Sequence, residues 1–286
     1  MINLKNKKAD IFVPDGTPIE KALKRTTHIA IGAHQDDIEI MAYHGIEACF
    51  GNKKLWFGGI TVTDGSGSPR AGIYGNYTDD QMKRVRLLEQ RKAAYVGEYS
   101  FQIQLGYKSK DVKNPENRNI IKDLIEILSK TSINTIYLHN PADKHDTHVA
   151  VMLKSIEAIR NLSPQKIKNI KKVYGCETWR DLDWMMDDRK VVLPTSIHEN
   201  LASALVSIYD SQIAGGKRYD LATLSRRFAN ATYLSTHEVD IYKSVTYAMD
   251  LTPLIKNKDL SIQEYVKNEI LLFLKDVEQR INKFQK

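Results

Sequence analysis

The first half of this 286-residue chain alternates short apolar runs with longer helical patterns, and this alternation limits the folds available to it. Strands are predicted at 27–31, 55–62, 101–105 and 133–138. Helices are predicted at 38–50, from about 79, at 120–128 and from about 145. Strands separated by helices form a parallel sheet with helices on both faces. The chain is therefore predicted to be an α/β protein.

The second half of the chain follows a different pattern. Helices are predicted at 197–212, 220–234 and 260–284, and a strand at 239–246. The last helix carries an apolar stripe of Ile262, Val266, Ile270, Phe273, Val277, Ile281 and Phe284. Core packing is the expected role of this stripe, and a subunit interface is the alternative. Because no linker interrupts the chain, residues 1–286 are expected to form one domain with a C-terminal helical extension from about 255.

The composition excludes several classes of protein. Apolar residues make up 42% of the chain and charged residues 27%, which does not fit a disordered protein. Two cysteines cannot form a disulfide framework or a four-thiolate zinc site. No apolar run approaches the roughly 18 residues that span a bilayer, and no signal-peptide pattern is visible. A cytoplasmic protein without a membrane partner is expected.

The net charge of +7 makes nucleic-acid binding an alternative hypothesis for the function of this protein. The densest basic group lacks the interleaved aromatic residues on which bases stack, and it comprises Lys166, Lys168, Lys171 and Lys172. A solvated loop or helix face explains that group better. The run Ile31-Gly32-Ala33-His34 holds a single glycine, so neither a dinucleotide fingerprint nor a P-loop is present. No nucleic-acid partner is expected.

Polar side chains gather where three of the predicted strands end. The clusters are Ala33-His34-Gln35-Asp36-Asp37, Thr63-Asp64-Gly65 and the segment 139–148, which contains His145 and His148. Parallel sheets of this kind bind their ligands at the carboxyl ends of the strands. We therefore expect these clusters to converge in one crevice.

The residue types in the first and third clusters suit a metal. His34 and Asp37 are three residues apart, as are His145 and His148. Two imidazoles and a carboxylate form a common ligand set for hydrolytic zinc. Of two adjacent carboxylates, one can bind the metal while the other acts as a general base. Helix capping by Asp36, Asp37 and His145 is the alternative, but it would have to place metal-competent residues at two strand ends.

These clusters resemble the motifs of the PIG-L/LmbE-like deacetylases. That family carries His-Pro-Asp-Asp-Glu after its first strand and Asp-x-His-x-Asp-His after a later one. The corresponding segments are His34-Gln35-Asp36-Asp37-Ile38-Glu39 and Asp143-Lys144-His145-Asp146-Thr147-His148. Weaker similarities are Thr63-Asp64-Gly65, the Arg-x-x-Glu pattern of Arg86 and Glu89, Leu105-Gly106-Tyr107 and Ser211-Gln212.

The resemblance implies a Rossmann-like three-layer α/β/α sandwich with a mostly parallel sheet. It also implies a zinc-dependent amide hydrolase that removes an N-acetyl group from an N-acetylglucosamine-type conjugate and releases acetate and a free amino sugar. One Zn²⁺ per chain is implied, with another divalent metal as the alternative. The implied partner is a small-molecule amino-sugar conjugate. A homo-oligomer is compatible with this interpretation of the sequence.

The same resemblance assigns roles to individual residues. His34, Asp37 and His148 would bind the zinc ion. Asp36 would be the general base, and His145 would stabilise the oxyanion or donate a proton. By weaker similarity to the family, Asp64 and Arg86 would contact the sugar or its substituent.

The sequence departs from the family pattern at three places. Gln35 replaces the proline of the first motif, and Tyr209 stands where many members have a histidine. Thr147 occupies the position of the aspartate that orients the catalytic histidine, which leaves Asp146 or Asp143 for that task. A catalytically silent zinc-binding member is therefore the alternative to an active enzyme.

Overall fold

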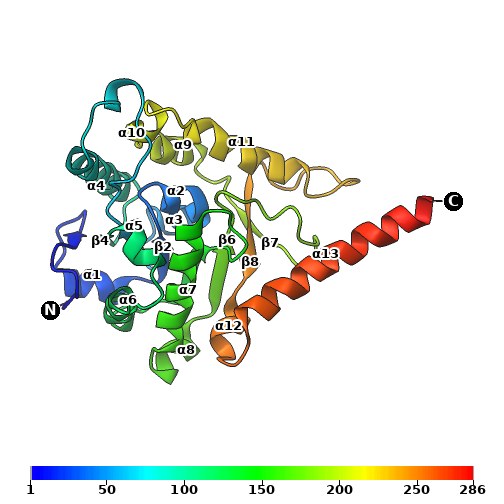
Figure 1. Ribbon diagram of the computed structural model, residues 1–286, viewed down its shortest axis with the longest axis horizontal. Helices are drawn as coiled ribbons and strands as arrows, with labels where there is room; N and C mark the ends of the chain where they lie inside the picture. The colour runs from blue at the N-terminus through cyan, green and yellow to red at the C-terminus, as the bar shows by residue number, and fades with distance from the viewer. Residues whose placement is uncertain (1, 286) are drawn as a thin grey trace.

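The computed structural model describes residues 2–285, in which eight strands form a single sheet (Figure 1). The strands are β1 (Asp10–Phe12), β2 (His28–Gly32), β3 (Phe57–Thr63), β4 (Phe101–Tyr107), β5 (Thr135–His139), β6 (Lys172–Cys176), β7 (Val191–Pro194) and β8 (Val245–Asp250). Their order across the sheet is β1-β4-β3-β2-β5-β6-β8-β7. The five strands from β4 to β6 are parallel, and β1 and β8 pair antiparallel to their neighbours.

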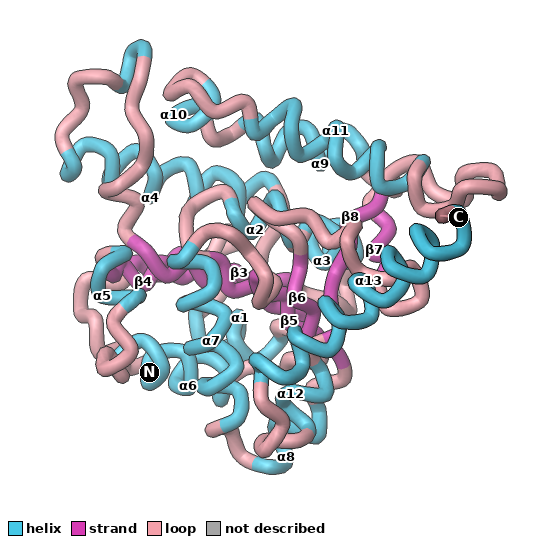
Figure 2. Tube along the Cα trace, turned by 45° about the vertical axis from the view of Figure 1, so that its right-hand side comes forward, coloured by secondary structure: helices cyan, strands magenta, loops and turns pink. Residues whose placement is uncertain are grey.

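Helices cover both faces of this sheet, as Figure 2 shows. They are α1 (Ile19–Arg25), α2 (Asp37–Met41), α3 (Tyr43–Cys49), α4 (Asp79–Val96), α5 (Ser109–Lys113), α6 (Asn119–Ser129), α7 (Asp146–Arg160), α8 (Pro164–Asn169), α9 (Glu199–Ser207), α10 (Asp210–Ile213), α11 (Tyr219–Thr232), α12 (Thr252–Lys256) and α13 (Ile262–Phe284), with a 3₁₀ turn at Gly72–Tyr74. Ile29 and Ile31 of β2 face one apolar core, and Ala30 between them faces the other. The predicted α/β sandwich with a mostly parallel sheet is confirmed.

The strands of the first half lie within a few residues of their predicted positions. The strand predicted at 239–246 is wrong over most of its length, because β8 begins only at Val245. Val239 and Ile241 lie in an exposed loop despite their alternating pattern. The short strands β1 and β7 at the two edges of the sheet were not predicted.

Two of the predicted helices are interrupted. The helix predicted at 38–50 divides at Ala42, whose φ of −115° ends α2 before α3 begins. The helix predicted at 197–212 likewise divides into α9 and α10. The first break lets α2 and α3 pack at different angles immediately after the polar cluster of β2.

Ile262 at the start of α13 packs against the core, but most of the apolar stripe does not, so the expectation of core packing is wrong for most of the helix. Phe273, Ile281 and Phe284 expose 39%, 49% and 79% of their surface. Only the start of the helix is anchored, through the Tyr265 hydroxyl on the Asp250 carbonyl at 2.6 Å and through an Arg189–Glu269 ion pair. Figure 1 shows the rest of α13 extending away from the sheet. None of the described helices has the length and apolar character needed to cross a membrane.

Candidate metal and substrate site

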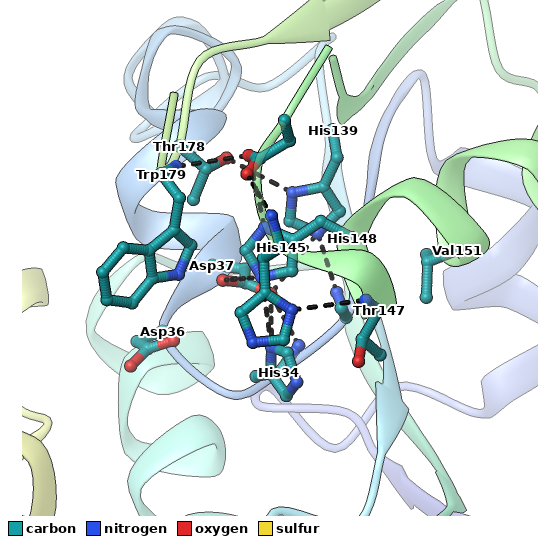
Figure 3. Close-up of polar contacts among 12 residues, drawn as sticks. His34, Asp36, Asp37, His139, His145, Thr147, His148, Val151, Thr178 and Trp179 are labelled. Atoms are coloured by element: carbon teal, nitrogen blue, oxygen red, sulfur yellow. Dashed lines mark hydrogen bonds and ion pairs between the residues drawn. The ribbon is translucent and has the colours of Figure 1, made fainter. Parts of the chain in front are cut away.

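The two predicted metal motifs meet at the carboxyl ends of the neighbouring parallel strands β2 and β5 (Figure 3). His34 and Asp37 follow β2, and His148 lies in the first turn of α7. His34 Nδ1 is 3.2 Å from His148 Nε2 and 3.3 Å from Asp37 Oδ2. His148 Nε2 is 3.4 Å from Asp37 Oδ1. The structure thus brings donor groups from two distant segments together, with Asp37 turning one carboxylate oxygen toward His34 and the other toward His148.

This spacing fits a zinc ion. Ligand atoms about 2.0–2.2 Å from a tetrahedral zinc lie about 3.3–3.6 Å from one another. Asp37 and His148 are buried, whereas His34 is partly exposed and so leaves one side of the cluster open. Although burial opposes its ionisation, the imidazoles of His148 and His139 hold the pKa of Asp37 well below its usual value. An anionic carboxylate beside two imidazoles is a ligand set that zinc prefers.

His145 lies next to these donors, and a nitrogen of its ring is within 4.8 Å of ring nitrogens of His34 and His148. Its ring stacks on that of His148 with the centroids 4.5 Å apart. Its Nδ1 accepts a hydrogen bond from the Thr147 amide at 3.3 Å. Burial lowers the pKa of His145, and a neutral ring in this setting carries its proton on Nε2. His145 also lines the adjoining cavity, so it can offer a proton to a molecule bound there.

Asp36 occupies a strained position at the same strand end. Its φ of 97° lies in a region that side chains other than glycine rarely adopt, and such strain is concentrated at functional sites. Its Oδ2 lies 3.1 Å from Nη2 of the buried Arg86. Burial raises the pKa of Asp36 to about 6, although Arg86 opposes the rise. This carboxyl lines the cavity and can exchange a proton near neutral pH.

The two predicted substrate contacts are placed differently. Arg86 lines the cavity, but its guanidinium is already bound to Asp36, to the Gln35 carbonyl and, at 3.5 Å, to Glu89. Asp64 does not line the cavity. Its carboxylate accepts from Ser66 and lies 3.4 Å from Lys83 Nζ. Arg86 is therefore placed to orient Asp36, and Asp64 remains outside the cluster.

His139, at the end of β5, is a residue of the site to which no role was assigned from the sequence. Its Nε2 lies 3.3 Å from Asp37 Oδ2 and accepts a hydrogen bond from the Ala33 amide at 3.0 Å. His139 also forms a second group with Asp37 and His148 whose potential ligand atoms lie within 4.8 Å of one another. In the sequence, only its position at the end of a predicted strand indicated that it could belong to the site.

Neither acid of the second motif contacts the ring of His145, and Asp143 lies against His148 instead. Its Oδ2 lies 3.4 Å from His148 Nδ1 and accepts from the Trp179 amide, and its Oδ1 accepts from the His145 amide at 3.0 Å. Asp146 is exposed. Asp143 therefore orients the ring of His148, whereas the ring of His145 is held by the Thr147 amide, which donates to Nδ1 where an acid would accept.

Replacing Asp143 with asparagine is expected to weaken zinc binding about 10- to 100-fold, because the carboxylate that orients His148 loses its charge. Competition against a chromophoric chelator measures the zinc affinity. The matched control is Asp146→Asn, three residues further on and exposed, which should retain the affinity of the unmodified protein. Equal affinities in the two variants would contradict the assignment of Asp143.

Tyr209, the departure from the family pattern, is buried behind the site. Its hydroxyl donates to Glu39 Oε2 at 2.6 Å, while Tyr99 and Gln90 donate to Oε1. These three hydrogen bonds hold the fully buried Glu39 on the helix that begins with Asp37. Tyr209 thus supports the metal-side helix and does not line the cavity.

A cavity of about 610 Å³ adjoins the donor cluster. Its walls come from the strand ends, from the loop after β3 and from α11. Besides the residues already named, they include Thr63, Gly65, Ser68, Pro69, Ser109, Lys113, Glu177, Thr178, Trp179, Gln212, Lys217, Tyr219, Thr223, Arg226 and Arg227. A volume of this size accepts a small ligand of one or two sugar units.

Comparison with solved structures shows the same fold in enzymes of different kinds. The N,N'-diacetylchitobiose deacetylase of Pyrococcus horikoshii aligns with a TM-score of 0.62 and 14% identity over 81% of this chain and 86% of its own. GalB, the 4-carboxy-2-hydroxymuconate hydratase of Pseudomonas putida, aligns with a TM-score of 0.58 and 15% identity over 79% and 96%. A deacetylase of teicoplanin biosynthesis, solved with teicoplanin, aligns with a TM-score of 0.56 and 13% identity over 79% and 98%.

Sequence comparison gives a more specific result. No curated protein has a sequence significantly similar to that of this chain. The family model described as PIG-L, GlcNAc-PI de-N-acetylase, matches residues 29–159. The matched segment contains both polar motifs and every donor group of the cluster. Residues 29–159 of this chain are therefore similar to the PIG-L family.

Proposed function

We propose that the protein is a zinc-dependent hydrolase that removes the N-acetyl group from an N-acetylglucosamine-type conjugate. The observation that carries this proposal is a tight cluster of His34, Asp37 and His148 beside the buried, proton-accepting carboxyl of Asp36. The similar folds of two deacetylases support the proposal. The hydratase with the same fold means that the fold by itself does not define the reaction.

His34, Asp37 and His148 would hold the zinc ion, with the open side of the cluster facing the cavity. When bound there, zinc supplies a Lewis acid that polarises a carbonyl and makes water more acidic. The carboxylates of Asp36 and Asp37 would thus have separate tasks, one in proton transfer and one in metal binding. Arg86 would keep Asp36 oriented for its task.

Asp36 takes the proton of the water molecule whose oxygen attacks the acetamide carbon. His145 donates from Nε2 to the oxygen that gains negative charge in the tetrahedral intermediate. As the carbon–nitrogen bond breaks, Asp36 returns its proton to the departing nitrogen. The products are acetate and a free amino sugar, and Asp36 is left ionised for the next turnover.

The test is a metal analysis combined with an acetate-release screen over N-acetylated sugars and their conjugates. We expect about one zinc ion per chain and release of acetate from at least one N-acetylglucosamine derivative. Bound zinc without acetate release from any member of the panel would indicate the catalytically silent alternative. Salt-dependent binding of arbitrary DNA would instead favour the nucleic-acid rival.

A further inference from the structure

The cavity wall contributed by α11 and the loop before it is strongly basic. Lys217, Arg226 and Arg227 all line the cavity from this side. These residues lie beyond residue 159, outside the segment that the family model matches. Within the described residues 2–285, none of the three has a carboxylate at ion-pair distance. We call these three residues the basic wall.

Arg227 is the most unusual member of the basic wall, because it is a buried guanidinium with incomplete partners. It exposes only 3% of its surface. Its Nη2 donates to the carbonyls of Glu39 and Ile40, but its Nε and Nη1 have no hydrogen-bond partner. The ring of Tyr43, 4.8 Å away, offers the charge a partial counterpart. A buried cation without an anion is costly, and an anion in the cavity would offset that cost.

Glu177 interacts with the charges of Arg226 and Arg227 but forms no ion pair with any residue of the basic wall. Glu177 lines the cavity, but its carboxylate already accepts from the amides of Tyr247 and Leu182 and from the Asn230 side chain. Gln212, which is buried on another wall, adds a free donor because its Nε2 has no partner. Unpartnered donors of Arg227 and Gln212 therefore remain among the residues that line the cavity.

Aromatic rings connect the basic wall with the metal side of the cavity. The indole of Trp179 lies 6.4 Å from the His145 ring, between centroids, and Figure 3 shows the two side by side. Lys217 Nζ lies 5.2 Å from the same indole, and the ring of Tyr219 packs against it edge to face. Apolar ring faces of this kind receive the flat side of a sugar. A ligand lying on Trp179 would extend from His145 to Lys217.

We propose that the basic wall binds a negatively charged group, a carboxylate or a phosphate, carried by the substrate on the part of the molecule away from the acetamide. This inference rests on the proposed deacetylase function, because that function places the acetamide of the substrate at the metal cluster. It narrows the substrate class to anionic conjugates of the amino sugar. The basic wall then acts as a specificity element built from the part of the chain outside the family match.

The test compares kcat/KM for three substrates of similar size. These are N-acetylglucosamine 1-phosphate, the carboxymethyl glycoside of N-acetylglucosamine and its neutral methyl glycoside. We expect at least one anionic substrate to be preferred over the methyl glycoside about tenfold or more, since charge-assisted hydrogen bonds are strong. The substrate with the larger preference identifies phosphate or carboxylate as the recognised group.

Lys217→Gln and Arg226→Gln are each expected to lower that preference about tenfold. The matched control is Arg218→Gln, because Arg218 is exposed, pairs with Asp220 at 2.8 Å and does not line the cavity. This control should keep the preference of the unmodified protein. Thermal unfolding of all three variants verifies that each is folded.

The decisive quantity is the ratio of kcat/KM for the anionic substrate to kcat/KM for the methyl glycoside. A ratio near one in the unmodified protein, or equal ratios in Lys217→Gln and Arg218→Gln, would overturn the inference. Glucose 1-phosphate and carboxymethyl glucoside carry no acetyl group, so their binding tests the anion site independently of deacetylation. Calorimetric binding of either that weakens in Lys217→Gln would support the anion site even if no sugar is deacetylated. Acetate release without any anion preference would support the proposed function and reject the anion site.

Discussion

Replacing Asp36 with alanine is expected to lower kcat for acetate release about 10²- to 10⁴-fold while leaving one zinc ion bound per chain. The reason is that Asp36 faces the cavity and Arg86, whereas the three donor groups come from other residues. The variant loses the carboxyl that accepts and returns the proton but keeps the metal cluster. Steady-state acetate release and metal analysis of the same preparation measure the two effects.

His34→Ala serves as the comparison, because it removes a donor group from the cluster and should lose both zinc and turnover. Asp36→Asn is a second variant that preserves the shape of the side chain beside the buried Arg86. Denaturant unfolding of each variant separates loss of chemistry from loss of fold. Turnover by Asp36→Ala at the rate of the unmodified protein would show that another group takes the proton.

Removing the metal with a chelator is expected to lower acetate release about 100-fold or more, and adding zinc should restore it. The donor cluster is formed only in the folded chain, so metal binding should also stabilise the protein against unfolding. Zinc at a thousandfold excess over its Kd would add about 4 kcal/mol to the free energy of unfolding. Calorimetric melting with and without zinc measures this change.

His148→Ala is the control for this experiment, since it lacks a buried donor of the cluster. Its Tm should respond to zinc much less than the Tm of the unmodified protein. Full activity in a preparation with far less than one metal ion per chain would contradict the proposed metal dependence. Restoration by a different divalent ion but not by zinc would reassign the metal while keeping the site.

The metal cluster could be predicted from the sequence because its chemistry is local. Each motif places its polar residues at a strand end, and the rule for parallel sheets brings strand ends together. His34 and Asp37 follow β2 directly, and His148 follows β5 by less than ten residues. Short spacing at strand ends therefore indicated His34, Asp37, His145 and His148 as metal candidates, and the family resemblance selected the three ligands among them.

The supporting residues show where this reasoning ends. Sequence spacing left Asp143 and Asp146 as equal candidates for orienting His145, but in the structure Asp143 lies against His148 and Asp146 is exposed. Burial of Glu39 among Tyr99 and Tyr209 depends on residues up to 170 positions apart. No periodicity or motif carries that kind of information, since these pairs depend on how α2 packs against the segment between α4 and β4 and against the residue before α10.

For the apolar stripe of α13, the sequence predicted the helix but not its exposure. Its period of apolar residues is that of a helix, and the helix was predicted correctly. The same pattern could not reveal that Phe273 and Ile281 would remain exposed. Helical periodicity describes one element by itself, whereas burial depends on what lies against it.

The sequence by itself determined the α/β class, the positions of the central strands and the residues that could bind a metal. Those properties follow from apolar periodicity and from short spacings, which act within a few residues of each other. Only the tertiary structure decided that Asp36 lies against Arg86, that Asp64 lies outside the cavity and that a basic wall from α11 faces the metal side. These placements depend on contacts between distant segments, because packing of the whole chain selects which polar groups share a cavity.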